Sequence, residues 1–217
     1  AVEPGRLQVI GNGAMVAGAR YTEGGQRAAL GRALLGDLGL EEYAHLAVFI
    51  GSGHPPNVAA AGHIIDAVRR RSDVAVALIG RHSEMLGRRR LPKGVVALGG
   101  VDDDTLASYL AGADVALNPI DEGSGSNLKL IDYFAAGVPV ITSAVGARGV
   151  PDVRRFALVA TPNALGQALD TLWSDPGVGA RALAARQWVE EHLDWSLLGS
   201  RFATVVLDAV RGSQVTR

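Results

Sequence analysis

The stretch "EGSGSNLKLIDYFAAGVPVIT", Glu122 to Thr142, decides the fold. After its glycines and serines, apolar residues recur at helical spacing over residues 126–136, with Ser126 suited to the N-cap. Gly137 ends this predicted helix, and an apolar strand follows at residues 138–142. A helix that leads directly into a buried strand predicts one unit of a parallel α/β sheet.

The same alternation runs along most of the chain. Apolar runs typical of buried strands lie at residues 46–50, 74–79, 95–98, 113–117, 138–142 and 157–159. Helical patterns lie at residues 57–71, 83–89, 103–110, 126–136 and 162–173, and near residues 178–191 and 195–211. Together they predict a Rossmann-like, doubly wound parallel sheet of about six strands with extra C-terminal helices.

The N-terminal region has a different pattern. "GRLQVIGNGAMVAGARYTEGG" predicts a short strand followed by a Gly-rich linker. The chain begins with Ala1 rather than methionine, so we expect it to be a piece of a longer protein. The predicted organisation is a leading strand and linker at residues 1–25 and one domain at residues 26–217.

The amino-acid composition argues against several classes of function. The 217 residues are 48% hydrophobic and 20% charged, which is typical of a globular protein. A net charge of −1 and an aromatic fraction of 5% argue against nucleic acid as a partner. The chain contains no cysteine, which excludes disulfides and thiolate sites and is typical of a cytoplasmic protein. No apolar run approaches the ~18 residues of a membrane span. The bias toward arginine, 19 against two lysines, indicates a GC-rich bacterial genome.

Glycines follow four of the predicted strands. They are Gly51, Gly53, Gly80, Gly99, Gly100, Gly123 and Gly125. Gathered at the carboxyl edge of a sheet, they would let backbone N–H groups approach a ligand closely. The alternative is that strand-to-helix turns simply need glycine, and it stays open. Neither G-x-G-x-x-G nor a P-loop occurs, since Val16 stands where "GNGAMVAG" needs its third glycine.

Lys129 is unexpected in the first turn of the predicted helix at residues 126–136. The helix dipole there disfavours a cation by roughly 0.3–1 kcal/mol unless an anion is bound. Asp132 is three residues further and lies on the same helical face. A lysine at a helix N-terminus suits a diphosphate, and a carboxylate suits ribose hydroxyls. The alternative is an exposed Lys129–Asp132 ion pair worth less than about 1 kcal/mol.

Other polar clusters have a structural interpretation. The arginine runs at residues 69–71 and 88–90 are expected to be solvated at helix ends. His54 and His82 are predicted to be solvated loop histidines. The acidic "VDDDT" reads as a helix cap with first-turn acids, so no metal site is expected.

Three stretches carry a family resemblance: "FIGSGHPPN", "VALIGR" and "VVALGGVDDDTLASYLAGADVALNPIDEGSGSNLKLIDYFAAGVPVITSAVGARGV". In order and spacing they resemble the donor-binding, C-terminal domain of retaining GT-B glycosyltransferases, most of all family 4. The resemblance spans about residues 7–209 and is most specific at residues 95–149. It implies that residues 26–217 bind a nucleoside-diphosphate sugar without a metal or other cofactor. It also implies a missing N-terminal domain that holds the acceptor, and membrane-surface contact only through the full-length protein.

The resemblance also implies roles for individual residues. Lys129 would reach the diphosphate and Glu122 the donor sugar, as the catalytic pair. Asp132 stands where the family has a ribose-binding glutamate, one methylene shorter and further from Glu122 than is usual. Ser52 and Asn57 stand where the family often has basic residues, which leaves phosphate neutralisation to Lys129. The remaining implied donor contacts are Gly51, Gly53, Arg81, Gly99, Val101, Gly123, Ser124, Gly125, Ser126, Asn127 and Leu128.

Two alternatives to a transferase stay open. One is half of a nucleotide-sugar epimerase, which should carry a richer set of buried carboxylates and histidines. The other is a module that binds a nucleotide sugar without chemistry. Turnover by the full-length protein distinguishes both from the transferase.

Overall fold

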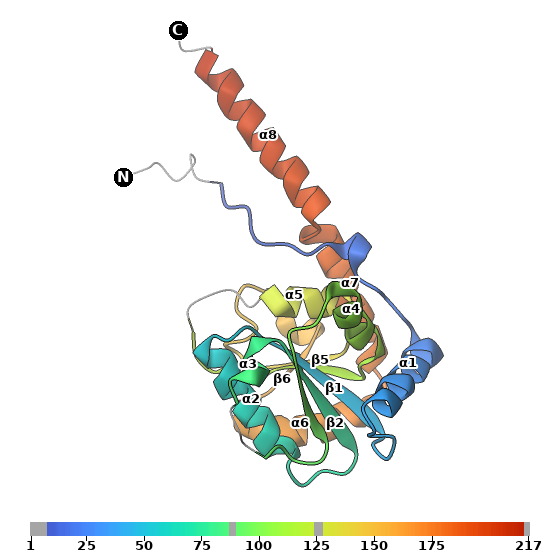
Figure 1. The fold of residues 1–217 in the computed structure, drawn as a ribbon. Helices are drawn as coiled ribbons and strands as arrows, with labels where there is room; N and C mark the ends of the chain where they lie inside the picture. Colours follow the sequence, from blue (N-terminus) through green and yellow to red (C-terminus); the bar gives the residue numbers. More distant parts are fainter. Residues whose placement is uncertain (1–7, 87–89, 124–127, 215–217) are drawn as a thin grey trace.

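The computed structural model describes residues 8–86, 90–123 and 128–214. Its centre is a sheet in the order β3-β2-β1-β4-β5-β6, with every pair of neighbours parallel (Figure 1). The strands are β1 His45–Ile50, β2 Val74–Ile79, β3 Val95–Gly99, β4 Val115–Asn118, β5 Val140–Thr142 and β6 Leu158–Val159. The predicted six-stranded, parallel, Rossmann-like sheet is confirmed.

Helices cover both faces of the sheet. They are α1 Gly24–Asp37, α2 Pro55–Val68, α3 Arg81–Glu84, α4 Asp103–Gly112, α5 Leu128–Ala135, α6 Leu165–Trp173, α7 Val178–His192 and α8 Trp195–Gln214, with 3-10 turns η2 Val16–Gly18, η3 Val153–Arg155 and η4 Pro162–Ala164. One core lies between the sheet and α1, α4, α5 and α7, and a second lies between the sheet and α2 and α6. Within β1, Leu46 and Val48 face the first core, and Ala47 and Phe49 the second. Burial on both faces explains the continuous apolar runs of the sequence.

The N-terminal region departs from the prediction. Helix α1 was not predicted, because only Gly31, Leu34 and Leu35 of its 14 residues are buried and its sequence has little helical periodicity. Gly31 packs so tightly on α4 that a Cβ there would lie 2.5 Å from the carbonyl oxygen of Gly112. The described part of the expected leading strand, residues 8–13, is not a strand, and Ala14 makes only an isolated bridge to Asp194.

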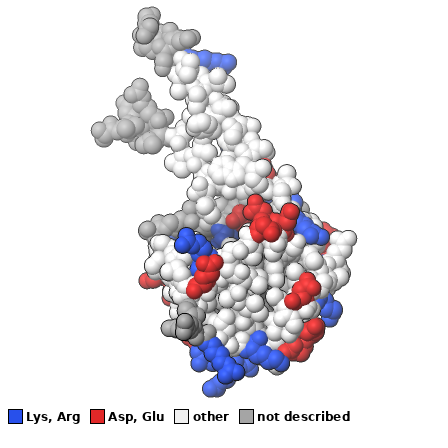
Figure 2. Space-filling model, in the orientation of Figure 1, with Lys and Arg blue, Asp and Glu red and all other residues white. Residues whose placement is uncertain are grey.

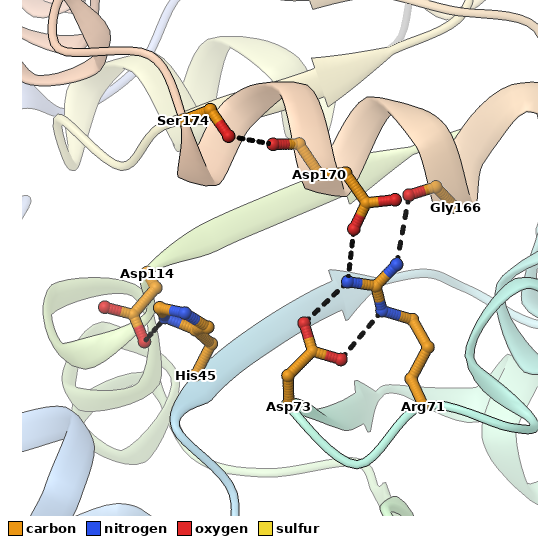
Figure 3. A network of polar contacts seen from close by, with 7 residues as sticks. All are labelled: His45, Arg71, Asp73, Asp114, Gly166, Asp170 and Ser174. Atoms are coloured by element: carbon orange, nitrogen blue, oxygen red, sulfur yellow. Dashed lines mark hydrogen bonds and ion pairs between the residues drawn. The ribbon is translucent and has the colours of Figure 1, made fainter.

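Arg71 corrects the expectation for its arginine run. Arg69 is exposed and pairs with Asp66, as a solvated cation at a helix end does. Arg71 instead binds Asp73 through two hydrogen bonds of 2.9 and 2.6 Å and reaches Asp170 of α6 at 2.7 Å (Figure 3). Its guanidinium lowers the pKa of the Asp73 carboxyl. The planar five-donor guanidinium thus joins the start of β2 to α6.

Helix α8 projects away from the rest of the domain (Figure 1). Its exposed large apolar side chains are Trp195, Phe202, Val206, Leu207 and Val210. Figure 2 shows it as a column with few charged groups on the face in view. The N-terminal segment leaves the domain on the same side as α8 (Figure 1). Among the described residues, no helix combines the length and apolarity needed to cross a bilayer.

The order in which the strands are added to the sheet reverses between β1 and β4. Helix α2 follows β1 to one face of the sheet, and α5 follows β4 to the other. The β1–β4 ladder pairs Ala47 with Val115 and Val48 with Ala116. Beyond it the buried hydroxyl of Tyr133, from α5, accepts a hydrogen bond from Ile50 N–H (2.8 Å) and donates one to the carbonyl of Leu117 (3.4 Å). One side chain therefore joins the two strand ends at the point where the sheet opens.

We predict that Tyr133→Phe lowers the free energy of unfolding by about 1–3 kcal/mol, because it leaves a buried N–H and a carbonyl without their partner. Urea unfolding measures the change. Tyr109→Phe is the matched control, since Tyr109 is also buried and its hydroxyl makes no hydrogen bond within the described residues. Equal effects of the two variants would show that the hydroxyl bridge contributes nothing.

Candidate functional site

Three elements meet at the ammonium group of Lys129. The residue lies in the first turn of α5, and its Nζ donates a hydrogen bond of 2.6 Å to Oδ1 of Asn57 in α2. The same nitrogen lies 5.2 Å from the ring centroid of Phe49 in β1. Lys129 thus connects the helices that follow β1 and β4, and the region between these helices is called the crevice below. This is the topological switch point, where doubly wound sheets bind their ligands.

The ammonium of Lys129 is desolvated and lacks an anionic partner. Among the described residues no carboxylate forms an ion pair with it, and burial lowers the pKa of Lys129 to about 8. The alternative interpretation, an exposed Lys129–Asp132 pair, is therefore wrong. A buried cation without a counter-charge destabilises the empty protein. An anion bound in the crevice would supply the missing charge.

Asp132 lines a cavity on the other side of the crevice. The cavity has a volume of about 340 Å³ and lies between α4, α5, the end of β1 and the N-terminal segment, with Ile50, Leu106 and Met15 among its walls. Asp132 is exposed at the surface of α5, and partial desolvation by its neighbours raises the pKa of its carboxyl. A carboxylate beside apolar walls is suited to accept hydrogen bonds from hydroxyl groups of a bound molecule.

The glycines at the strand ends pack against each other. Gly80 has a φ of 110°, and a Cβ there would lie 2.3 Å from the carbonyl oxygen of Gly51. The N–H of Gly51 donates to Ile79 O (3.0 Å), and the N–H of Gly99 donates to Ser83 Oγ (3.0 Å). These two N–H groups are therefore occupied within the protein. The described contacts support the turn-forming interpretation for Gly51, Gly80 and Gly99.

His82 lies under these loops and is not the solvated histidine that was predicted. It is fully buried, and its Nδ1 lies 2.8 Å from the carbonyl oxygen of Gly51. That oxygen can only accept, so the proton is on Nδ1. Burial lowers the pKa of His82 and favours the neutral ring. The prediction failed because the loops at Gly51 and Gly80 pack closely together and enclose His82, two residues after Gly80. His54 is exposed, as predicted.

The remaining predicted residues follow the carboxyl ends of β2, β3 and β4. Arg81 is exposed at the start of α3, beside Gly53, and Val101 is half-buried against the first core. Glu122 and Gly123 are exposed after β4, and Arg148 donates a hydrogen bond of 2.9 Å to the Gly123 carbonyl.

Four of the predicted contacts lie outside the described residues: Ser124, Gly125, Ser126 and Asn127. The predicted N-cap falls among them. Leu128, directly after them, is exposed at the start of α5.

Another cavity does not coincide with this site, and no metal-ligand cluster competes with it among the described residues. A cavity of about 530 Å³ lies at the opposite, amino edge of the sheet, near His45 and Trp173, and none of the predicted site residues lines it. Within residues 8–86, 90–123 and 128–214, no three His, Cys, Asp or Glu side chains gather as metal ligands would. The crevice at Lys129 is therefore the best candidate site.

Fold and site together define a Rossmann-like α/β domain with a desolvated lysine at its switch point. Residues 44–175 match the family model described as glycosyl transferases group 1, and the chain belongs to this family. It is 31% identical over 151 residues to a phosphatidyl-myo-inositol mannosyltransferase of Mycobacterium leprae, an alignment covering 66% of this chain and 40% of that protein. The resemblance seen in the sequence is thus confirmed at the level of the family.

Solved structures share the fold at low sequence identity. Sucrose-phosphate synthase from Thermosynechococcus elongatus superposes with a TM-score of 0.74 at 19% identity, over 94% of this chain and 53% of that one. HepE from Anabaena, solved with UDP-glucose, gives 0.74 at 16% identity, over 93% and 57%. The chain thus spans only about half the length of the proteins it matches.

We predict that Lys129→Met stabilises the empty protein by about 1–3 kcal/mol at pH 7, since it removes a desolvated charge. The unfolded lysine titrates near 10.4 and the folded one at about 8, so protonation favours the unfolded chain. Wild-type stability should therefore rise between these two pH values, and the advantage of the variant should shrink. Denaturant unfolding at pH 7 and pH 10 measures both effects.

The matched control is Lys93→Met. The Lys93 side chain is 80% exposed and pairs with Glu42 at the surface. No gain in stability is expected from this change. A gain as large as that of Lys129→Met would mean that burial of the ammonium is not the cause.

Proposed function

We propose that this chain is the donor-binding half of a retaining glycosyltransferase, and that it binds a nucleoside-diphosphate sugar in the crevice at Lys129. The observation that carries the proposal is the half-buried ammonium of Lys129, unpaired by any described carboxylate at the switch point of the sheet. The diphosphate would lie at Lys129 and the ribose hydroxyls at Asp132, in the adjoining cavity. The complex of HepE with UDP-glucose, on the same fold, supports this class of ligand.

The proposed reaction places charge at Lys129. Cleavage of the bond between the anomeric carbon and the diphosphate oxygen leaves negative charge on the departing nucleoside diphosphate. A fixed ammonium in a water-poor crevice stabilises that charge more than solvent would. Glu122, exposed after β4, is assigned to the donor sugar, and the new bond forms with the anomeric configuration retained. No metal or other cofactor is part of this proposal.

The acceptor would be held by a second domain N-terminal to this chain. Two observations support this assignment: the relatives are about twice as long, and α8 carries an apolar surface too large for a free helix. The N-terminal segment borders the Asp132 cavity and leaves on the same side as α8 (Figure 1). A second domain docked there would face the crevice. We also propose a cytoplasmic location, on the ground of the cysteine-free sequence.

The first test is nucleotide binding by this chain and its Lys129→Ala variant. Thermal shift against UDP, GDP, ADP, CDP and dTDP selects the base, because ligand at 100 times its dissociation constant adds about 2.7 kcal/mol. Lys129→Ala should weaken binding of the selected diphosphate by about 1.5–3 kcal/mol and leave its nucleoside nearly unaffected. Lys93→Ala, the change at the other lysine, should alter neither. Equal losses for diphosphate and nucleoside would remove Lys129 from the diphosphate site.

The second prediction separates donor binding from sugar transfer. Residues 1–217 should bind the donor but transfer no sugar, because transfer needs an acceptor in near-attack geometry and a crevice closed against water. Binding and transfer of a radiolabelled donor are measured with residues 1–217 and, for comparison, with the full-length protein. Robust transfer by this chain alone would refute the half-enzyme proposal. Donor binding without turnover by the full-length protein would favour a non-catalytic module, and conversion of the donor sugar into its epimer would favour an epimerase.

A further inference from the structure

The side chain of Asn57 holds together two parts of the crevice. Its Oδ1 accepts the 2.6 Å hydrogen bond from Lys129 Nζ, and its Nδ2 donates to both the carbonyl and the hydroxyl oxygen of Ser52, each at 3.1 Å. Asn57 is itself buried, with 8% of its surface exposed. The amide thus connects the ammonium on α5 to the loop that follows β1.

That loop is fixed from its other side as well. A Cβ on Gly51 would lie 2.9 Å from Nδ1 of His82 and 3.0 Å from Asn57, so both side chains are in close contact with the loop backbone. His82 also packs edge-on against Phe49, the ring that faces Lys129. Asn57 therefore lies against a closely packed part of the loop backbone.

We propose that Asn57 is the positioning residue for Lys129: it holds the ammonium in the binding geometry before the donor arrives. This inference rests on the function proposed above. A lysine side chain has four rotatable bonds, and immobilising it opposes binding. A neutral amide can hold the ammonium without cancelling its charge, whereas a carboxylate would compete with the diphosphate. One of the three N–H donors is used by Asn57, and two remain for phosphate oxygens.

The first experiment needs no ligand. The chain contains two lysines, so carbon-13 relaxation at Cε can be assigned to Lys129 and Lys93 with one variant. In the wild type Lys129 should be rigid and the exposed Lys93 mobile. Asn57→Ala should make Lys129 as mobile as Lys93. If Lys129 is already mobile in the wild type, or stays rigid in Asn57→Ala, the proposal is wrong whatever the protein binds.

The second experiment is a double-mutant cycle on binding of UDP and inorganic pyrophosphate by calorimetry. Asn57→Ala should weaken binding about three- to tenfold when Lys129 is present and have no effect in the Lys129→Ala background. Equal losses in both backgrounds would mean that Asn57 only supports the Ser52 loop, and would overturn the proposal. If the wild-type chain binds no nucleoside diphosphate at all, the proposed function itself is overturned.

Asn57→Asp keeps the shape of the buried side chain and guards against misfolding of the alanine variant. Its carboxylate should pair with Lys129, keep it rigid in the relaxation experiment and weaken UDP binding more than Asn57→Ala does. Asn163→Ala, at an exposed asparagine in η4, is the matched control and should change neither mobility nor binding. UDP binding by Asn57→Asp that equals the wild type would refute the argument from charge.

Discussion

The structure depends on how the sheet opens between β1 and β4. The hydrogen-bonded pairing of β1 with β4 stops before the ends of these strands. The helices that follow them, α2 and α5, leave toward opposite faces of the sheet. Tyr133 makes this opening stable, because its buried hydroxyl satisfies both Ile50 N–H and the Leu117 carbonyl where the strands part. The residue is on the same helix as Lys129 and Asp132. The hydrogen bonds of the Tyr133 hydroxyl therefore satisfy two backbone groups and also hold in place α5, the helix that carries the candidate site.

Position on that helix separates the two charged side chains. Lys129 reaches back toward β1 and α2, where it meets Phe49 and Asn57. Asp132 is one turn further and lines the cavity toward α4 and the N-terminal segment. The two groups do not neutralise each other, although they are three residues apart on one face. The proposed ligand, a nucleoside diphosphate, has an anionic end for Lys129 and a hydroxyl-bearing end for Asp132.

The sequence was sufficient for the sheet because its strands are buried on both faces, and continuous apolar runs identify such strands without knowledge of their neighbours. It failed for α1, which packs through Leu34, Leu35 and the close contact of Gly31 with Gly112 and has no regular apolar stripe. The sequence drew attention to Lys129, since a cation in a first turn contradicts the helix dipole, and its binding role stays a prediction. His82, Arg71 and Asn57 were not predictable, because their roles depend on contacts with residues remote in the chain or on loop packing that no periodicity records.

The N-terminal segment and α8 bear on the proposed second domain. A donor crevice must open to admit a nucleotide sugar, yet transfer requires that water be excluded. In this chain the Asp132 cavity is walled on one side by the N-terminal segment, and α8 exposes apolar side chains where both ends of the chain leave the domain. A docked second domain would bury that apolar surface, and the free energy of burial would hold the crevice closed. The same contact would bring an acceptor to the sugar end of the donor. Stability of the whole protein and exclusion of water from its reaction would then have one common cause.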